Sequence, residues 1–291
     1  MTKLSFTLDH IGVVVPDVPA AGLAYQKLGF TITPQSSHKR QRPDGGFDPL
    51  GTGNHCVMLR RGYLELIGIT DTSLPHDSLK ARLERYHGLQ LIALGTEDAV
   101  AVEAAWIAAA GQGVRPLTPL GRDVPQVEGG TKYGSFGIVY LESAAFPEAE
   151  LFAIQHHSLD VLWQPALLDH ANGAEGLVGL DLITPDVGAT CARLARLGLD
   201  VDPSGAVPSA RFQDGGELVL LDPEQARRRY PGIALHAAPS VAAMRIAVAS
   251  LSATSEYFRK NAIAFTAADG VLRVAPDLAC GVVVDFVEET A

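Results

Sequence analysis

Two polar side chains stand within strand-like stretches that are otherwise almost wholly apolar. His10 lies in the run 8–17, and Glu65 lies in the run 63–69. Because side chains alternate between the two faces of a strand, Glu65 shares its face with Tyr63 inside an apolar surface. An ionised carboxylate buried without a partner is costly or becomes protonated. We therefore expect a metal ion or His10 to compensate Glu65, the candidate catalytic residue, and take Tyr63 as a candidate substrate contact.

Other histidines and cations accompany these two candidates. His55 follows the glycine-containing segment 51–53, and it either lines the same interior or lies on the surface. His156 and His157 are adjacent in a predicted strand, so at most one of them faces the site, and His156 is the candidate. The loop 34–53 either closes over an anionic substrate or is simply solvated, and we favour solvation. Its basic side chains are His38, Lys39, Arg40 and Arg42.

One supersecondary pattern, in the order β-α-β-β-β, recurs four times and must position these residues. The four copies begin near residues 6, 89, 177 and 244. The first copy has predicted strands at 6–15, 30–33, 54–59 and 63–69. The second has predicted strands at 89–94, 114–117, 135–141 and 150–156, with a loop at 121–134.

Composition narrows the function classes. The 291 residues are 47% hydrophobic and 19% charged, which is enough for two ordinary cores, and we expect two domains. No apolar run is long enough to span a bilayer and we identify no secretory signal, so we expect a cytoplasmic protein. The three widely spaced cysteines favour free thiols. A net charge of −10 without a long basic cluster argues against nucleic acid and favours a small molecule as the partner, and the lack of a long apolar run argues against a membrane partner.

Several ordered motifs resemble those of the vicinal oxygen chelate superfamily, which includes glyoxalases, bleomycin-resistance proteins and dioxygenases. In the first copy they are Asp9-His10-Ile11, Leu28-Gly29-Phe30 and the strand 63–67. The segments 51–54, 154–157 and 170–174 resemble the glyoxalase-like domain group within that superfamily. The resemblance implies an α+β fold of four βαβββ modules paired into two cupped mixed β-sheets. It implies a glyoxalase-like domain at 1–160, a linker at 161–175 and a degenerate second domain at 176–291.

In that superfamily, the first and last strands of two paired modules each give one ligand to a divalent ion. The resemblance therefore implies His10 and Glu65 from the first module and, after a shift of 80 residues, Gln90 from the second. The last strand gives Gln155, or Glu150 in an alternative register. Such donors suit Zn, Ni, Mn or Fe(II). One carboxylate balances little of the charge of a dication, so a metal-free pocket is the alternative.

The C-terminal copies lack this ligand set, because the positions that match His10 are Gly179 and a residue near Met244. The resemblance implies a glyoxalase-like protein that acts on a small molecule, with metal-dependent lyase or isomerase chemistry. The alternative is a metal-free protein that binds or sequesters a small molecule. An extradiol dioxygenase ranks below both, because here the N-terminal half would carry the metal. A monomer and a homodimer both suit a chain of four modules.

Overall fold

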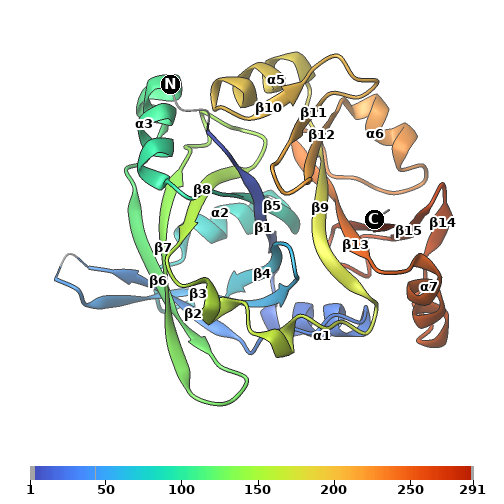
Figure 1. Ribbon diagram of the computed structural model, residues 1–291, viewed down its shortest axis with the longest axis horizontal. Helices are drawn as coiled ribbons and strands as arrows, with labels where there is room; N and C mark the ends of the chain where they lie inside the picture. The colour runs from blue at the N-terminus through green and yellow to red at the C-terminus, as the bar shows by residue number, and fades with distance from the viewer. Residues whose placement is uncertain (1–3, 43, 290–291) are drawn as a thin grey trace.

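Four βαβββ modules follow one another in the computed structural model, which describes residues 4–42 and 44–289 (Figure 1). The first contains β1 (Thr7–Val14), α1 (Val18–Lys27), β2 (Ser36–Gln41), β3 (Phe47–Met58) and β4 (Tyr63–Ile69). After α2 (Asp77–Arg85), the second contains β5 (Gly88–Gly95), α3 (Ala99–Ala110), β6 (Thr118–Pro125), β7 (Thr131–Tyr140) and β8 (Glu150–His156). Short 3-10 turns occupy Gly111–Gly113 and Pro165–Leu167.

The second pair of modules repeats this order with shorter strands. After α4 (Leu159–Leu162), the third module contains β9 (Ala174–Ile183), α5 (Val187–Arg196), β10 (Asp200–Asp202), β11 (Ser209–Arg211) and β12 (Glu217–Leu221). Helix α6 (Pro223–Arg229) leads to β13 (Ser240–Val248), α7 (Leu251–Lys260), β14 (Thr266–Ala268), β15 (Val271–Val274) and β16 (Val283–Glu288). The predicted α+β class with two mixed β-sheets is confirmed.

Three of the four module helices begin with an aspartate that caps the first turn. Oδ1 of Asp17, Asp98 and Asp186 each accepts a hydrogen bond of 2.9 Å from the backbone N–H three residues later. A cap of this kind stabilises a helix by about 1 kcal/mol. Gly29 and Gly198 follow α1 and α5 with φ of 93° and 90°, where a side chain would be strained. These local signals fix the ends of the helices and thereby the length of each module.

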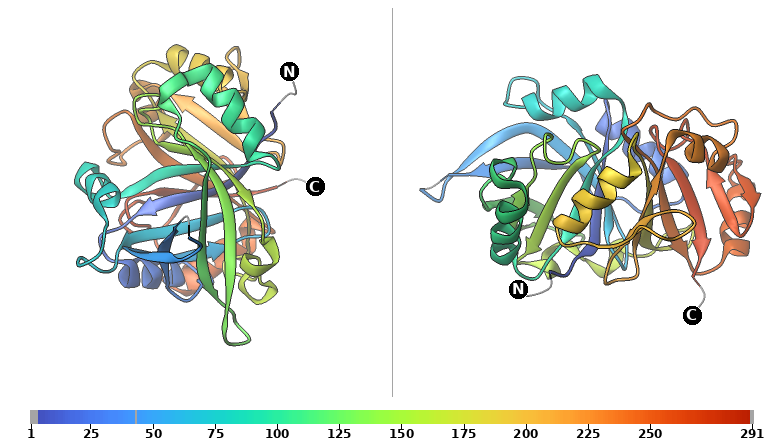
Figure 2. Two further views of the ribbon diagram at one scale, coloured as in Figure 1. Left: turned by 90° about the vertical axis from the view of Figure 1, so that its left-hand side faces the viewer. Right: turned by 90° about the horizontal axis from the view of Figure 1, so that it is seen from above.

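The two sheets share one strand order, but only the first closes on itself. Their orders are β1-β4-β3-β2-β6-β7-β8-β5 and β10-β11-β12-β9-β13-β16-β15-β14. In the first sheet, the β2–β3 and β6–β7 hairpins are long and cross each other, so that β2 meets β6 at Lys39 and Gly121 (Figure 1; Figure 2). In the second sheet, β10 and β14 have three residues each and do not meet. The first sheet therefore encloses an interior, and the second is an open cup.

Both long hairpins correct expectations from the sequence. The segment predicted as a loop at 34–53 contains β2 and much of β3, and the loop predicted at 121–134 belongs largely to β6 and β7. Residues 30–33 and 114–117, predicted as strands, are irregular apart from an isolated bridge at Val114. Because the hairpins project from the core and are rich in polar residues, they lack the apolar alternation by which a strand is recognised.

A continuous apolar core joins the two halves of the chain. It includes Ile11 of β1 together with Met244 of β13 and Phe286 of β16. The indole nitrogen of Trp106, at the end of α3, donates a hydrogen bond of 3.0 Å to the backbone oxygen of Leu197, after α5. The outer faces of the two sheets, with their module helices, are thus packed against each other.

The segment between β8 and β9 is ordered and packs into the interior of the first sheet. Val161, Leu162 and Leu167 belong to the apolar cluster of that interior. Further along, Asn172 is fully buried, and its Nδ2 donates a hydrogen bond of 2.9 Å to the backbone oxygen of Leu28. The motif at 170–174 therefore ties the end of α1 to the start of the second half.

The structure also bears on the expected state of the cysteines and on membrane-spanning helices. The three cysteines are free thiols, as expected. Across residues 4–42 and 44–289, each helix is too short or too polar to cross a membrane.

Candidate functional site

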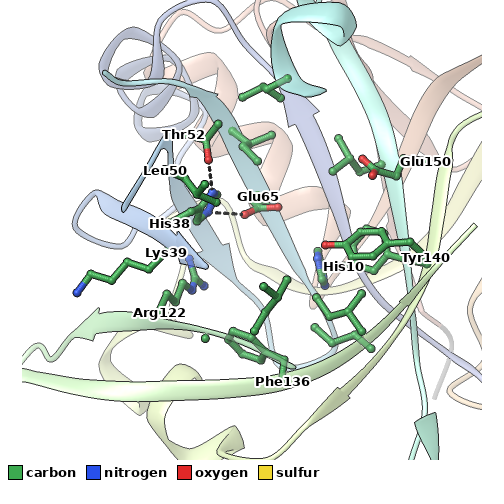
Figure 3. Close-up of a pocket in the computed structure, with 18 of the residues that line it drawn as sticks. His10, His38, Lys39, Leu50, Thr52, Glu65, Arg122, Phe136, Tyr140 and Glu150 are labelled. Atoms are coloured by element: carbon green, nitrogen blue, oxygen red, sulfur yellow. Dashed lines mark hydrogen bonds and ion pairs between the residues drawn. The ribbon is translucent and has the colours of Figure 1, made fainter. Parts of the chain in front are cut away.

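The interior of the closed sheet holds a cavity of about 230 Å³ (Figure 3). Both modules of the first half supply its walls, and α2 adds Leu79 and Arg82. Apolar side chains line much of it, among them Leu91, Phe136, Ile138, Phe152 and Ile154. The polar side chains that line it include His10, His38, Tyr63, Glu65, Arg122 and Glu150.

His10 projects from β1 into this cavity and is 3% exposed. A β-bulge at Asp9 interrupts the pairing of β1 with β5, so the Asp9 carboxylate lies beside the His10 ring. Oδ1 of Asp9 is 2.6 Å from Nδ1 of His10. The ring stacks on Tyr63 with 4.2 Å between centroids and meets Phe152 edge-on at 5.5 Å. The carboxylate and the two aromatic rings together fix the orientation of His10.

The carboxylate of Asp9 forms hydrogen bonds with two histidines, His10 and His156. Nε2 of His156 lies 3.1 Å from both carboxylate oxygens. Burial raises the pKa of Asp9, but the hydrogen bonds and charges of His10 and His156 outweigh burial and lower this pKa to about 2. Asp9 is therefore ionised near neutral pH.

Glu65 faces the same cavity from β4 (Figure 3). Nδ2 of Asn54 donates a hydrogen bond to Oε1 of Glu65, and Nε2 of His38 lies 3.4 Å from the same oxygen. Burial raises the pKa of Glu65, but the hydrogen bond and charge of His38 and the charges of His10 and Arg122 lower it to about 2. Among the protein groups, the direct partners are thus Asn54 and His38 rather than His10. Because so low a pKa makes a poor proton acceptor at neutral pH, a catalytic role for Glu65 stays a prediction that its surroundings do not favour.

Arg122 reaches the cavity from β6, across the seam where the sheet closes. Its Nη1 donates hydrogen bonds to Oγ of Ser36 at 3.0 Å and to Oδ1 of Asn54 at 2.8 Å. The side chain is buried, and within the described part of the chain it forms no ion pair with a carboxylate. Asn54 therefore links the cation of Arg122 to the anion of Glu65 through its amide. Sequence reasoning missed Arg122 because it lies in a segment predicted as a loop.

The pairing of β1 with β5 corrects the assignment of Gln90 as a metal ligand. The two strands pair around Ile11 and Ile92, so the residue that matches His10 is Leu91. Gln90 points to the opposite face, where its Nε2 donates to backbone oxygens at the end of α2. The expected shift was one residue short, and a slip of one residue turns a strand side chain to the other face.

The same register corrects the assignment of Gln155. Since β8 runs beside β5 as β4 runs beside β1, the residue that matches Glu65 is Phe152. Gln155 instead bonds the backbone at the start of α3, where its Oε1 accepts and its Nε2 donates. The alternative residue, Glu150, does line the cavity, but Arg82 neutralises it at 2.5 Å.

These matches test whether the cavity suits the divalent ion that the superfamily implies. Of the four ligand positions, two hold His10 and Glu65, and two hold the apolar side chains of Leu91 and Phe152. A cluster of three or more His, Cys, Asp or Glu side chains suited to a metal ion does not occur among the described residues. Catalytic zinc sites use three protein ligands. The residues present therefore do not fit a resident divalent ion.

The two remaining histidine candidates lie outside the lining of the cavity. Nδ1 of His55 is 2.8 Å from the backbone oxygen of Thr33, and its ring packs under α1 at Gly22. His55 is thus a half-buried packing residue rather than a substrate contact. His156 lies behind Asp9 and contacts Trp163 edge-on at 5.4 Å between centroids, so it does not reach a ligand in the cavity. Of the predicted substrate contacts, Tyr63 alone lines the cavity.

Two of the basic residues in the segment interpreted as solvated line the cavity instead. His38 and Lys39 line the cavity from β2, with the Lys39 ammonium paired to the exposed Asp123, whereas Arg40 and Arg42 are exposed. Two successive residues of β2 can line the same cavity because a β-bulge between Ser37 and Lys39 interrupts the alternation of the strand. The cluster of basic residues in the segment 34–53 was the only sequence signal for a role of this segment in the site. The sequence does not predict which of these basic side chains line the cavity.

The chain itself fills the concave face of the second sheet. Tyr230, after α6, packs into the cup and donates a hydrogen bond of 2.7 Å to the buried carboxylate of Asp181. The register confirms Gly179 as the match for His10. The positions that match the four ligand positions of the first half are Gly179, Val219, Ala243 and Asp285. Asp285, the one donor among them, is bound by Arg273 at 2.6 and 2.7 Å.

Comparison with known proteins defines the family. The profile of the glyoxalase-like domain matches residues 8–198, and the chain belongs to that family. Its structural neighbours lie in the vicinal oxygen chelate superfamily. Among curated proteins, none matches the chain significantly.

Three solved structures show the extent of the likeness. A hypothetical protein from Staphylococcus aureus is 12% identical, with a TM-score of 0.67 over 98% of this chain and 100% of its own. A mutant of 4-hydroxymandelate synthase from Streptomyces coelicolor is 12% identical, with a TM-score of 0.60 over 98% and 93%. A variant of homoprotocatechuate 2,3-dioxygenase from B. fuscum is 12% identical, with a TM-score of 0.55 over 98% and 71%. At this identity the likeness shows the fold alone.

Proposed function

We propose that this glyoxalase-like protein binds a small, largely apolar organic molecule in the cavity of its first sheet and holds no resident divalent ion there. The observation that carries the proposal is the register of the closed sheet, which puts Leu91 and Phe152 at two of the four ligand positions. Of the two functions that the sequence leaves open, the donor set favours the metal-free binding protein over the metal-dependent lyase or isomerase.

The size and lining of the cavity support a ligand of particular chemistry. Its volume of about 230 Å³ is below the roughly 300–1,000 Å³ of sites for drug-sized molecules, so the ligand is smaller than these. Phe136, Phe152 and Tyr140 offer aromatic surface. Arg122 offers a buried cation on the polar side (Figure 3). A small ring or chain with one polar or anionic group matches this combination.

A substitution that fills the cavity tests the proposal. We expect small aromatic carboxylates and their neutral analogues, screened by thermal shift, to include compounds that raise the Tm of the wild-type protein. Leu91→Trp should abolish these shifts because the indole occupies the ligand space. Leu23→Trp is the matched control, since Leu23 is 61% exposed on α1. Shifts that persist in Leu91→Trp, or a panel without any shift in the wild-type protein, would contradict binding in this cavity.

A further inference from the structure

We infer that His10 is a base that abstracts a proton from the bound molecule, and that Asp9 and His156 are the residues that position it. The inference rests on the proposed function, because the cavity must first admit a small molecule. The ligand class is then a carbon acid, an apolar molecule whose C–H bond lies next to an electron-withdrawing group. The contacts of His10, Asp9 and His156 carry the assignment of these roles.

The contact with Asp9 sets the tautomer of His10. A carboxylate only accepts hydrogen bonds, so the 2.6 Å contact between Oδ1 of Asp9 and Nδ1 of His10 puts the ring proton on Nδ1. In the neutral ring this leaves a lone pair on Nε2. Nε2 has no hydrogen-bond partner within the described part of the chain, and the His10 side chain lines the cavity. The free lone pair is therefore available to a molecule in the cavity.

The surroundings of the ring keep the lone pair in place. Tyr63 stacks at 17° to the His10 ring, and Phe152 packs edge-on at 64°. The bulge at Asp9 brings the carboxylate beside the ring, whereas regular alternation would turn Asp9 to the opposite face of β1. Asp9 and His10, which are successive residues of β1, therefore lie side by side, and the carboxylate of Asp9 orients the imidazole of His10.

His156 completes the arrangement from the far side of Asp9. Its Nε2 lies 3.1 Å from both oxygens of Asp9, so Nε2–H is the donor and Nδ1 is left as an acceptor. That Nδ1 atom is buried and has no partner among the described residues. A buried acceptor without a hydrogen bond costs free energy. The ring of His156 keeps this orientation nonetheless, with Nε2 bound to Asp9 and Nδ1 unpaired. His156 therefore serves the orientation of the carboxylate.

The proposed step is a proton transfer that needs no oxidant or co-reactant. The C–H bond of the substrate breaks, its proton forms an N–H bond at Nε2 of His10, and the electron pair stays on the substrate. Asp9 then faces an imidazolium, which its negative charge stabilises. Arg122, a buried cation without a carboxylate ion pair among the described residues, lines the same cavity and favours the anion that forms. His10 returns the proton to the product or to water.

A small carbon acid that reports its own deprotonation tests the inference. In 5-nitrobenzisoxazole, loss of the ring C–H proton breaks the N–O bond and releases coloured 2-cyano-4-nitrophenolate. We expect the wild-type protein to catalyse this opening and His10→Ala to fall to the buffer rate. His157→Ala is the matched control, because the exposed neighbour takes no part in the arrangement. No catalysis by the wild-type protein, or an equal rate in His10→Ala, would overturn the inference.

The positioning role has its own readout. Asp9→Asn presents an amide donor to Nδ1, which should move the ring proton to Nε2 and lower the rate by roughly 10²-fold or more. Nitrogen-15 spectra of the histidine side chains report this tautomer directly. His156→Gln, which keeps a donor, should retain more of the rate than His156→Leu. A proton on Nε2 of His10 in the wild-type protein, or an unchanged rate in Asp9→Asn, would overturn the assignment of roles.

Binding of the product separates this inference from the proposed function. A spectral titration with 2-cyano-4-nitrophenolate measures occupancy of the cavity without catalysis. If the product binds wild-type protein and not Leu91→Trp, while His10→Ala leaves the rate unchanged, the cavity proposal stands and the base assignment fails. If the product binds Leu91→Trp as well as the wild-type protein, the cavity proposal fails too.

Discussion

His10 and Glu65 line one cavity, yet their partners suit them to different roles. His10 has a carboxylate on Nδ1 and, among the described residues, no partner on Nε2, whereas the carboxylate of Glu65 already accepts from Asn54 and lies beside His38. Alternation predicted that Glu65 lies on an apolar face of its strand, and the resemblance to the vicinal oxygen chelate superfamily implied that His10 and Glu65 share one site. Their partners were not predictable, because Asn54 and His38 reach Glu65 from the long hairpin that was interpreted as a loop.

The ionisation of Glu65 predicts how its loss changes acid stability. Its pKa is about 2 in the folded chain against an ordinary value of 4.5, so it stabilises the fold above about pH 4.5, and this contribution is lost as the pH falls toward 2. Glu65→Gln should lower the free energy of unfolding near neutral pH by on the order of 3 kcal/mol and flatten its pH dependence between these values. Denaturation in urea at a series of pH values measures both effects.

A surface glutamate provides the control for this experiment. Glu84 is exposed at the end of α2, so Glu84→Gln should leave the pH dependence unchanged. Equal pH dependence in Glu65→Gln and the wild-type protein would contradict the electrostatic account of Glu65.

At the scale of elements, the β2–β3 and β6–β7 hairpins make the site. They close the first sheet at Lys39 and Gly121 and bring Arg122 into the interior. The apolar strands and the capped helices were predictable because their signals are local. The hairpins were not, because strand pairing across more than 80 residues stabilises them and their own sequences are polar.

Two helix glycines predict opposite effects of one substitution. A Cβ at Gly22 of α1 would lie 2.9 Å from both His55 Cδ2 and Ile32 Cδ1, so Gly22→Ala should destabilise the fold by about 1–3 kcal/mol. At Gly188 of α5 the nearest atom would be 3.6 Å away, so Gly188→Ala should stabilise it by up to about 1 kcal/mol. Midpoints of urea denaturation measure both. Equal shifts of the same sign would contradict the packing of His55 beneath α1.

At the scale of the whole molecule, the two halves share a core but differ in what fills their cups. The closed sheet of the first half keeps a cavity, and the open cup of the second holds Tyr230 against Asp181. The fourfold repeat predicted the four βαβββ modules from the sequence, whereas the core that the two halves share was not predicted. The filling of the second cup was not predictable, since α6 lies between modules and its position depends on buried ion pairs such as Arg229 with Asp181 at 2.6 Å.

The shared core predicts that the halves unfold together. Tyr25 of α1 donates a hydrogen bond of 3.4 Å to the backbone oxygen of Ala279, and Phe30 stacks on Phe286 at 6.0 Å between centroids. Differential scanning calorimetry should show one transition, which Trp106→Phe lowers in temperature without splitting. Two separate transitions in the wild-type protein would show that the core between the halves is not cooperative.

Metal titration of a variant with the full donor set tests the central claim most directly. His10 and Glu65 already occupy two of the four ligand positions. Leu91→His combined with Phe152→Glu would place a donor at each of the other two. Calorimetric titration with Zn²⁺ or Ni²⁺, on protein purified without chelator or affinity tag, should show about one ion bound per chain in this variant and none in the wild-type protein. Elemental analysis of the wild-type protein should likewise find no stoichiometric metal. One tightly bound ion per wild-type chain, lost in His10→Ala, would contradict the metal-free cavity.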